Sequence, residues 1–68
     1  MKHISEQIEF FLRESSVTPA QLSRESGVHE VYISRLKLRK QKDTSSSNAD
    51  ALRAAMMKLD PKTAARVL

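Results

Sequence analysis

The chain has 68 residues, enough for one domain, and its lack of cysteine excludes disulfides and thiolate metal sites. Its two histidines are too few for a zinc site, and no apolar run approaches the ~20 residues that a membrane helix needs. The net charge of +4 is unevenly spread: residues 1–34 hold three basic and five acidic side chains, against nine basic and three acidic in residues 35–68.

The first predicted helix covers residues 3–15. The chain has one glycine, two prolines and no stretch of alternating apolar and polar residues, so it reads as helices with few breaks. The apolar residues that recur on one face of this first helix are Ile4, Ile8, Phe11 and Leu12. Phe10 lies off this face, so we expect it to be only partly buried.

The second predicted helix has a clear start and a clear end. Thr18 is an N-cap, Pro19 suits the first helical turn, and Gln21 lies three residues after the cap. This spacing is a capping box, in which Thr18 and Gln21 satisfy each other's free backbone donors. Leu22 faces inward. The helix ends before Gly27, which can adopt a positive φ.

The third predicted helix covers residues 30–39 and takes its apolar contacts from Val28, Ile33 and Leu36. A polar segment over residues 40–47 follows. It contains no candidate for the core, so it is predicted to be a loop.

Two more helices are predicted after this loop. The fourth begins at Ser46 or Ser47, with Asp50 favouring its N-terminal dipole. Its inward-facing residues are Ala49, Leu52, Met56 and Leu59. Asp60 and Pro61 form a second cap-plus-proline start, which predicts a short fifth helix over residues 62–68.

Positive charge is concentrated from Arg35 to Lys42, where five of eight residues are Lys or Arg. Such a stripe fits a polyanion such as nucleic acid. It fits a solvated helix surface equally well, because Lys and Arg are good helix formers. An anionic membrane is disfavoured as a third option, because the stripe contains little bulky apolar surface.

The segment from Thr18 to Leu38 places two short helices around a tight turn that holds the only glycine of the chain. Two helices that cross steeply through a three- or four-residue turn need one residue at positive φ, and glycine adopts it without strain. The sequence therefore predicts a helix-turn-helix at about residues 18–39, with Gly27 as its structural turn residue.

The stretch GVHEVYISRL resembles the turn and recognition helix of the lambda repressor and Cro-type helix-turn-helix family. That family commonly shows a glycine, an aliphatic residue, four variable residues and then aliphatic-Ser-Arg-aliphatic. The residues on this pattern are Gly27, Val28, Ile33, Ser34, Arg35 and Leu36. One helix before the motif and two after it match the family's layout as well. The resemblance thus implies a compact all-α domain of four to five helices over residues 1–68.

The chain departs from the family at four positions. Ser23 stands where the family usually has alanine, at the close contact between the two helices. His29 stands where a small polar cap is favoured, and Pro19 where a glutamine commonly opens the second helix. Glu30 begins the recognition helix with a charge that phosphates repel.

The resemblance implies that the exposed face of the third helix enters the major groove of duplex DNA. The implied base-contacting residues are Arg35, Ser34, Val31, Glu30 and His29. Arg35 is the candidate for a bidentate contact to guanine, and Val31 for packing on a thymine methyl. For Glu30 we favour the alternative that it stabilises the helix dipole.

Contacts to the phosphate backbone are implied for a second set of polar residues. This set is Thr18, Gln21, Tyr32, Lys37, Arg39, Lys40 and Lys42. Four neutralised phosphates would give a slope of roughly −3.6 for log K against log salt.

The sequence contains no carboxylate pair, Ser-His set or phosphate-binding glycine loop, so we expect no enzyme activity, cofactor or metal. Charged Glu6 and Glu9 follow Lys2 where a signal peptide needs an apolar stretch, so we expect a cytoplasmic protein. We therefore expect a sequence-specific transcriptional regulator, a repressor that binds a near-palindromic operator as a homodimer. The alternative is a protein-interaction module, or an antitoxin-like protein that binds a partner protein and regulates its own operon.

Overall fold

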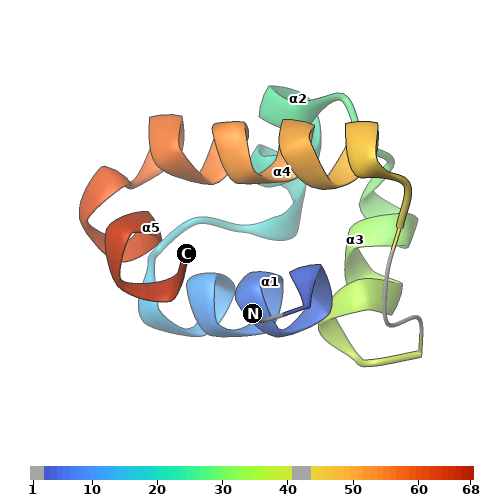
Figure 1. The fold of residues 1–68 in the computed structure, drawn as a ribbon, viewed down its shortest axis with the longest axis horizontal. Coiled ribbons are helices and arrows are strands. Elements are labelled where there is room, and N and C mark those ends of the chain that lie inside the picture. The colour runs from blue at the N-terminus through green and yellow to red at the C-terminus, as the bar shows by residue number, and fades with distance from the viewer. Residues whose placement is uncertain (1–2, 41–43) are drawn as a thin grey trace.

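The computed structural model describes residues 3–40 and 44–68, and the regular secondary structure in these residues is entirely α-helical (Figure 1). The described helices are α1 (Ile4–Glu14), α2 (Pro19–Ser26), α3 (Glu30–Lys37), α4 (Ser46–Leu59) and α5 (Pro61–Val67). The all-α class expected from the sequence is confirmed, and each predicted helix is present. None of these helices is long and apolar enough to cross a membrane.

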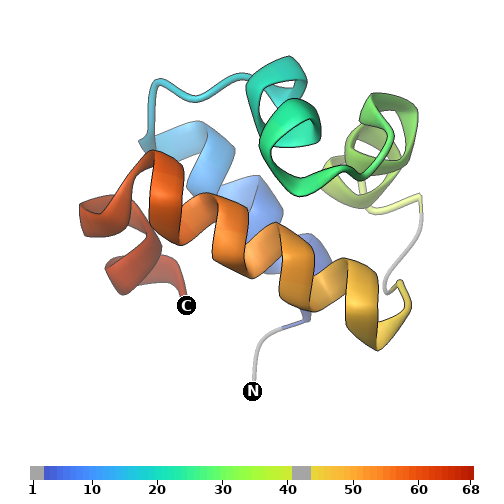
Figure 2. The ribbon, with the colours of Figure 1, turned by 90° about the horizontal axis from the view of Figure 1, so that it is seen from above.

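The helices surround one core. In Figure 1, α1 and α4 lie on opposite sides of that core, while α3 closes one end and α5 closes the other. Helix α1 contacts α3 and α5, and α4 contacts α2 and α5. Helices α2 and α3 also contact each other, and Figure 2 shows them next to one another beyond α4. This arrangement leaves the outer surface of α3 uncovered by the other helices.

The core takes side chains from the inward faces of the described helices and from the turn after α2. Its buried apolar residues are Ile4, Ile8, Phe11, Leu22, Val28, Ile33, Leu36, Ala49, Leu52, Ala55, Met56, Ala64 and Val67. Phe10 packs against this core and stays partly exposed, as the sequence predicts. Leu12 and Leu59 are also only partly buried, although helical spacing places both inward. Each lies in the last turn of its helix.

The starts of α4 and α5 are fixed by side-chain caps. Ser45 accepts a hydrogen bond from the backbone N–H of Asn48 at 3.3 Å, so α4 begins at the next residue. Asp60 accepts from the backbone N–H of Thr63 at 3.2 Å and from its hydroxyl at 2.8 Å. Helix α5 therefore begins at Pro61, one residue earlier than the sequence predicts.

Helix α3 ends two residues earlier than the sequence predicts, because Arg39 adopts a left-handed φ of 62°. The N–H of Arg39 donates to the carbonyl oxygen of Leu36 at 3.2 Å, and that of Lys40 donates to Arg35 at 3.0 Å. These two bonds form a Schellman motif, which satisfies carbonyl groups at the helix end. Glycine usually occupies the left-handed position, so the arginine there costs conformational energy that other contacts must offset.

Candidate nucleic-acid interface

The turn between α2 and α3 is fixed by hydrogen bonds from both of its sides. Gly27 has a φ of 79°, and its N–H donates to the carbonyl oxygen of Ser23 at 2.8 Å. The Ser23 hydroxyl donates to the carbonyl oxygen of Val28 at 2.7 Å, and the Ser26 hydroxyl accepts from the N–H of Val28 at 3.1 Å. A Cβ at Gly27 would meet no atom within 4 Å. The glycine is therefore required by its backbone conformation and not by lack of space.

The start of α2 carries the predicted capping box. The Thr18 hydroxyl oxygen accepts from the N–H of Gln21 at 3.2 Å, and Gln21 Oε1 accepts from the N–H of Thr18 at 2.8 Å. Both side chains are exposed at this helix end. Because its Oε1 is occupied, Gln21 presents its amide N–H groups as donors to any ligand at the start of α2.

Helix α3 has one buried side and one exposed side. Ile33 and Leu36 are completely buried, whereas Val31 is 53% and Leu38 62% exposed. At 100° per residue, the exposed side brings together five residues on one helix face. These are Glu30, Val31, Ser34, Arg35 and Leu38, of which Ser34 is half-buried. Four of the five predicted base-contacting residues thus share one continuous face.

The fifth, His29, is the N-cap of α3. Its Nδ1 accepts from the backbone N–H of Val31 at 3.1 Å. A backbone N–H can only donate, so Nδ1 carries no proton in this arrangement and the neutral ring carries its proton on Nε2. The exposed ring therefore offers a donor, and not an acceptor, to a ligand. The sequence pattern places a cap at this position, and histidine fills it in place of the small polar residue that is usually favoured.

Tyr32 and Lys37 border the exposed face on its two sides. Tyr32 is 36% exposed and lies between the exposed face and buried Leu36. Lys37 is exposed on the opposite border, on the same side of the helix as Glu30 and two turns further along. Both positions are consistent with contacts beside a groove, rather than inside it.

The basic stripe divides into unpaired and paired side chains. Arg35, Lys37 and Lys40 are exposed and form no ion pair with any residue in the ranges 3–40 and 44–68. Arg39 differs, because its guanidinium is bound to the carboxylate of Glu9 in α1 at 2.6 Å. The predicted contact of Lys42 lies outside the described residues. Among the residues that the structure describes, the positive charge available at the end of α3 therefore comes from three side chains.

Glu9 is bound by two arginines. Its Oε2 accepts from Nη2 of Arg13 at 2.7 Å, one helical turn further along α1. The hydrogen bond from Arg39, together with the charges of both arginines, lowers the pKa of the Glu9 carboxyl below its ordinary value of 4.5. A pairing across thirty positions of sequence has no signature in helical spacing, so sequence reasoning missed it.

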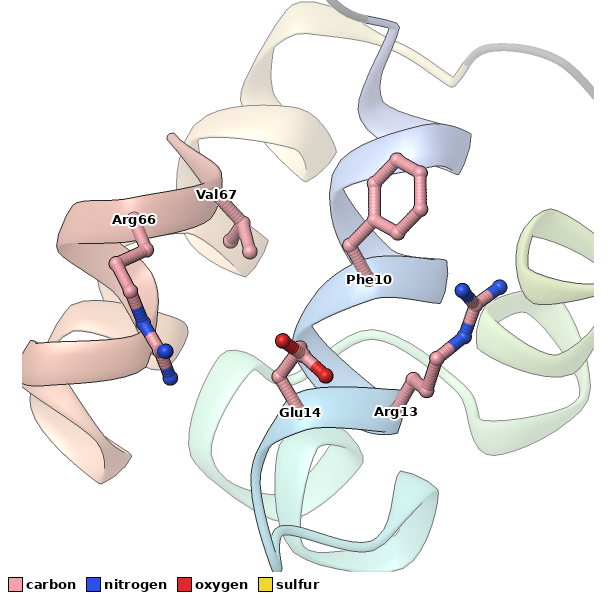
Figure 3. A pocket seen from close by; sticks show the side chains of 5 residues that line it. All are labelled: Phe10, Arg13, Glu14, Arg66 and Val67. Carbon is pink, nitrogen blue, oxygen red and sulfur yellow. The ribbon is translucent and has the colours of Figure 1, made fainter.

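A separate hollow of about 310 Å³ lies between α1 and α5. Figure 3 shows its lining, which is Phe10, Arg13 and Glu14 from α1 and Arg66 and Val67 from α5. The Arg13 guanidinium lies 5.2 Å from the centroid of the Phe10 ring, within the range of a cation–π contact. The hollow takes no residue from α3, so it is distinct from the exposed face described above. In the described part of the chain, no three His, Asp or Glu residues are grouped to hold a metal ion.

Comparison with known proteins gives no family. No protein-family model, no curated protein sequence and no solved structure matches the chain. The functional argument therefore depends on the chain's own residues.

Proposed function

We propose that this protein is a sequence-specific duplex DNA-binding domain of a transcriptional regulator. The observation that carries this proposal is the exposed face of α3, which holds the exposed Arg35, a side chain without an ion pair to any described residue, and has the basic residues Lys37 and Lys40 toward its end. An uncovered helix with such a face has the dimensions to enter the major groove. Unpaired cations beside it supply attraction to phosphates.

The α2–turn–α3 unit supports a helix-turn-helix of the lambda repressor and Cro type. Three residues separate the helices, and Gly27 has the positive φ that such a turn needs. The bond from Ser23 to Val28 joins α2 to the turn that leads into α3. We assign α3 as the recognition helix and α2 as the helix that lies across the DNA backbone.

The proposed reading of bases starts from Arg35, which donates two hydrogen bonds to O6 and N7 of guanine. Val31 packs on a thymine methyl, and Ser34 bonds a base or a phosphate. His29 donates from Nε2 and so selects an acceptor, either a purine N7 or a phosphate oxygen. Glu30 stands in the first turn of α3, where it stabilises the helix dipole.

Phosphate contacts are proposed for residues at both ends of the unit. Lys37 and Lys40 supply charge at the end of α3, and the Gln21 amide and Thr18 hydroxyl supply polar groups at the start of α2. Tyr32 lies at the border, where its hydroxyl can reach the backbone. Such contacts hold the register of the domain without reading sequence.

We further propose that the protein acts as a homodimeric repressor on a near-palindromic operator. The Cα atoms extend over 26 × 25 × 20 Å. Two copies of that size fit side by side when their recognition helices occupy half-sites about 34 Å apart.

The test is selection of the purified chain on a random duplex library at near-physiological salt. Enrichment of a two-fold symmetric motif is the expected result, and one enriched half-site would indicate that the domain binds DNA as a monomer. The matched control is Arg35→Ala, which should enrich no motif while keeping weak salt-sensitive binding. Absence of enrichment by the wild-type chain contradicts the proposal.

A second candidate is a protein-binding module, and one observation favours it. Val31 and Leu38 expose most of their apolar surface on the same face as Arg35. Exposed apolar surface of this kind is common at protein interfaces. An antitoxin-like protein would combine the two activities. Adding duplex DNA and measuring whether it protects α3 distinguishes the candidates. A protein-only module would show no protection of α3 by DNA.

A further inference from the structure

The Glu9 carboxylate joins two helices that are far apart in the sequence. Its Oε1 accepts from Nε of Arg39 at 2.8 Å and lies 2.6 Å from Nη2 of the same side chain. Its Oε2 accepts from Arg13 at 2.7 Å. Both oxygens are thus engaged by guanidinium groups, and α1 is tied to the turn that ends α3. We call this set of Glu9, Arg13 and Arg39 the clasp.

The clasp fixes Arg39 through its backbone and its side chain together. The backbone of Arg39 is in the left-handed region, where it closes the end of α3. Its side chain meets Glu9 through two nitrogens, and the Glu9 side chain is only 26% exposed. A single exposed ion pair contributes little to stability. The clasp, however, also connects two parts of the fold, because it bonds the end of the exposed helix to α1.

We propose that Glu9 is a positioning residue that withholds Arg39 from DNA and holds the end of the recognition helix in place. The inference rests on the proposed function. It changes one assignment made from the sequence, since Arg39 then contributes no phosphate contact. Lys37 and Lys40 remain the phosphate-contacting residues at the end of α3.

Withholding one arginine favours specificity. Each phosphate contact adds affinity for every duplex alike, so it raises binding to random DNA as much as to the operator. A helix end held against α1 keeps Arg35 in register with its base, which benefits only the correct sequence. Glu9 therefore lowers total affinity while raising the ratio of specific to nonspecific binding.

The test is a salt titration of binding to a random duplex and to the selected duplex. For Arg39→Gln, we expect the slope of log K against log salt to stay unchanged, while the ratio of specific to nonspecific affinity falls. For Glu9→Gln, which frees Arg39, we expect the slope to steepen by about 0.9. Between about 50 and 200 mM salt, this variant would lose about 3.5-fold more affinity than the wild type.

The matched control is Glu14→Gln, which removes the same charge from α1 outside the clasp and should leave the slope unchanged. A slope that flattens by about 0.9 in Arg39→Gln would overturn the inference, because Arg39 would then touch a phosphate in the wild type. Equal slopes for Glu9→Gln and Glu14→Gln would overturn it too. If the wild type binds no duplex at any salt, the proposed function itself fails. The slope results above require a wild type that binds DNA, so failure of the inference and failure of the proposed function are distinguishable. Circular dichroism confirms that each variant is folded.

Discussion

Ser23 and Val28 are joined across the turn by a hydrogen bond of 2.7 Å from the serine hydroxyl to the valine carbonyl oxygen. The lambda repressor and Cro-type family, which this segment resembles, usually has alanine at the position of Ser23, and alanine could not make this bond. The departure from the family pattern therefore adds a contact at the junction of α2 and α3. It also gives a partner to a carbonyl group that is partly buried there.

Replacing Ser23 with alanine should lower the free energy of unfolding by about 1 kcal/mol, because the Val28 carbonyl loses its donor. Urea unfolding measures this change. Ser16→Ala, an exposed serine outside the helices, is the control and should have little effect. Equal midpoints for the two variants would mean that the Ser23 bond contributes nothing.

Substitutions of Gly27 can show whether a side chain at this position destabilises the fold through backbone strain or through steric crowding. Alanine at this position should destabilise the fold by about 1–2 kcal/mol, since a Cβ disfavours the left-handed region. Asparagine should cost less, because it adopts that region more readily, and β-branched valine should cost more. Thermal unfolding of the three variants tests the order. Since a Cβ meets no atom within 4 Å, a large loss in Gly27→Asn would contradict this account.

Arg35→Ala and Lys40→Ala should differ in what they weaken. We expect Arg35→Ala to cost about 1–3 kcal/mol on the selected duplex and much less on random DNA, because a base contact is lost. Lys40→Ala should weaken both duplexes about equally and flatten the salt slope by about 0.9. Fluorescence anisotropy at several salt concentrations measures both quantities. Losses of equal size on both duplexes for Arg35→Ala would place that side chain on phosphate.

Stability should fall at acidic pH through Glu9 and Asp60. Hydrogen bonds from Arg39 lower the pKa of Glu9 below 4.5, and hydrogen bonds from the backbone and side chain of Thr63 lower the pKa of Asp60 below 3.8. Both carboxylates are thus favoured in the folded state. The stability that they contribute is complete above these ordinary values and is lost as the pH falls through the lowered pKa values.

Urea unfolding between neutral pH and about pH 3 tests this dependence. Glu9→Gln and Asp60→Asn should each be less stable than the wild type at neutral pH, with a difference that shrinks as the pH falls. Glu14→Gln serves as the control. A difference that stays constant over this range would show that the carboxylate charge does not matter at these positions.

The helices and their inward faces could be predicted from the sequence because they follow local rules. Apolar spacing placed Ile8 and Phe11 in the core, and the capping box located the start of α2 at Pro19. Gly27 marked the turn because few residues other than glycine adopt a positive φ without strain.

The features of the fold that could not be predicted from the sequence depend on contacts between distant residues or on unusual backbone conformations. The end of α3 was predicted too late, because the left-handed residue there is Arg39 and not glycine. The bond of Glu9 to Arg39 joins α1 to the turn after α3, the bond of Lys58 to Glu25 joins α4 to α2, and charge counts do not reveal such pairings. Leu59 is only partly buried, although its helical spacing predicts an inward-facing side chain. The predicted DNA contacts of Arg35 and its neighbours stay predictions.

Asp60 is at once the last cap of α4 and the first cap of α5. No connecting loop separates the two helices, so the corner between them, at Asp60, contains no residue that is free of cap contacts. An inserted residue between Leu59 and Pro61 would have to break either the bond from the N–H of Asp60 to the carbonyl of Met56 or the bonds to Thr63. This corner is therefore a poor place for an insertion or a tag, and its length is as constrained as the identity of its residues.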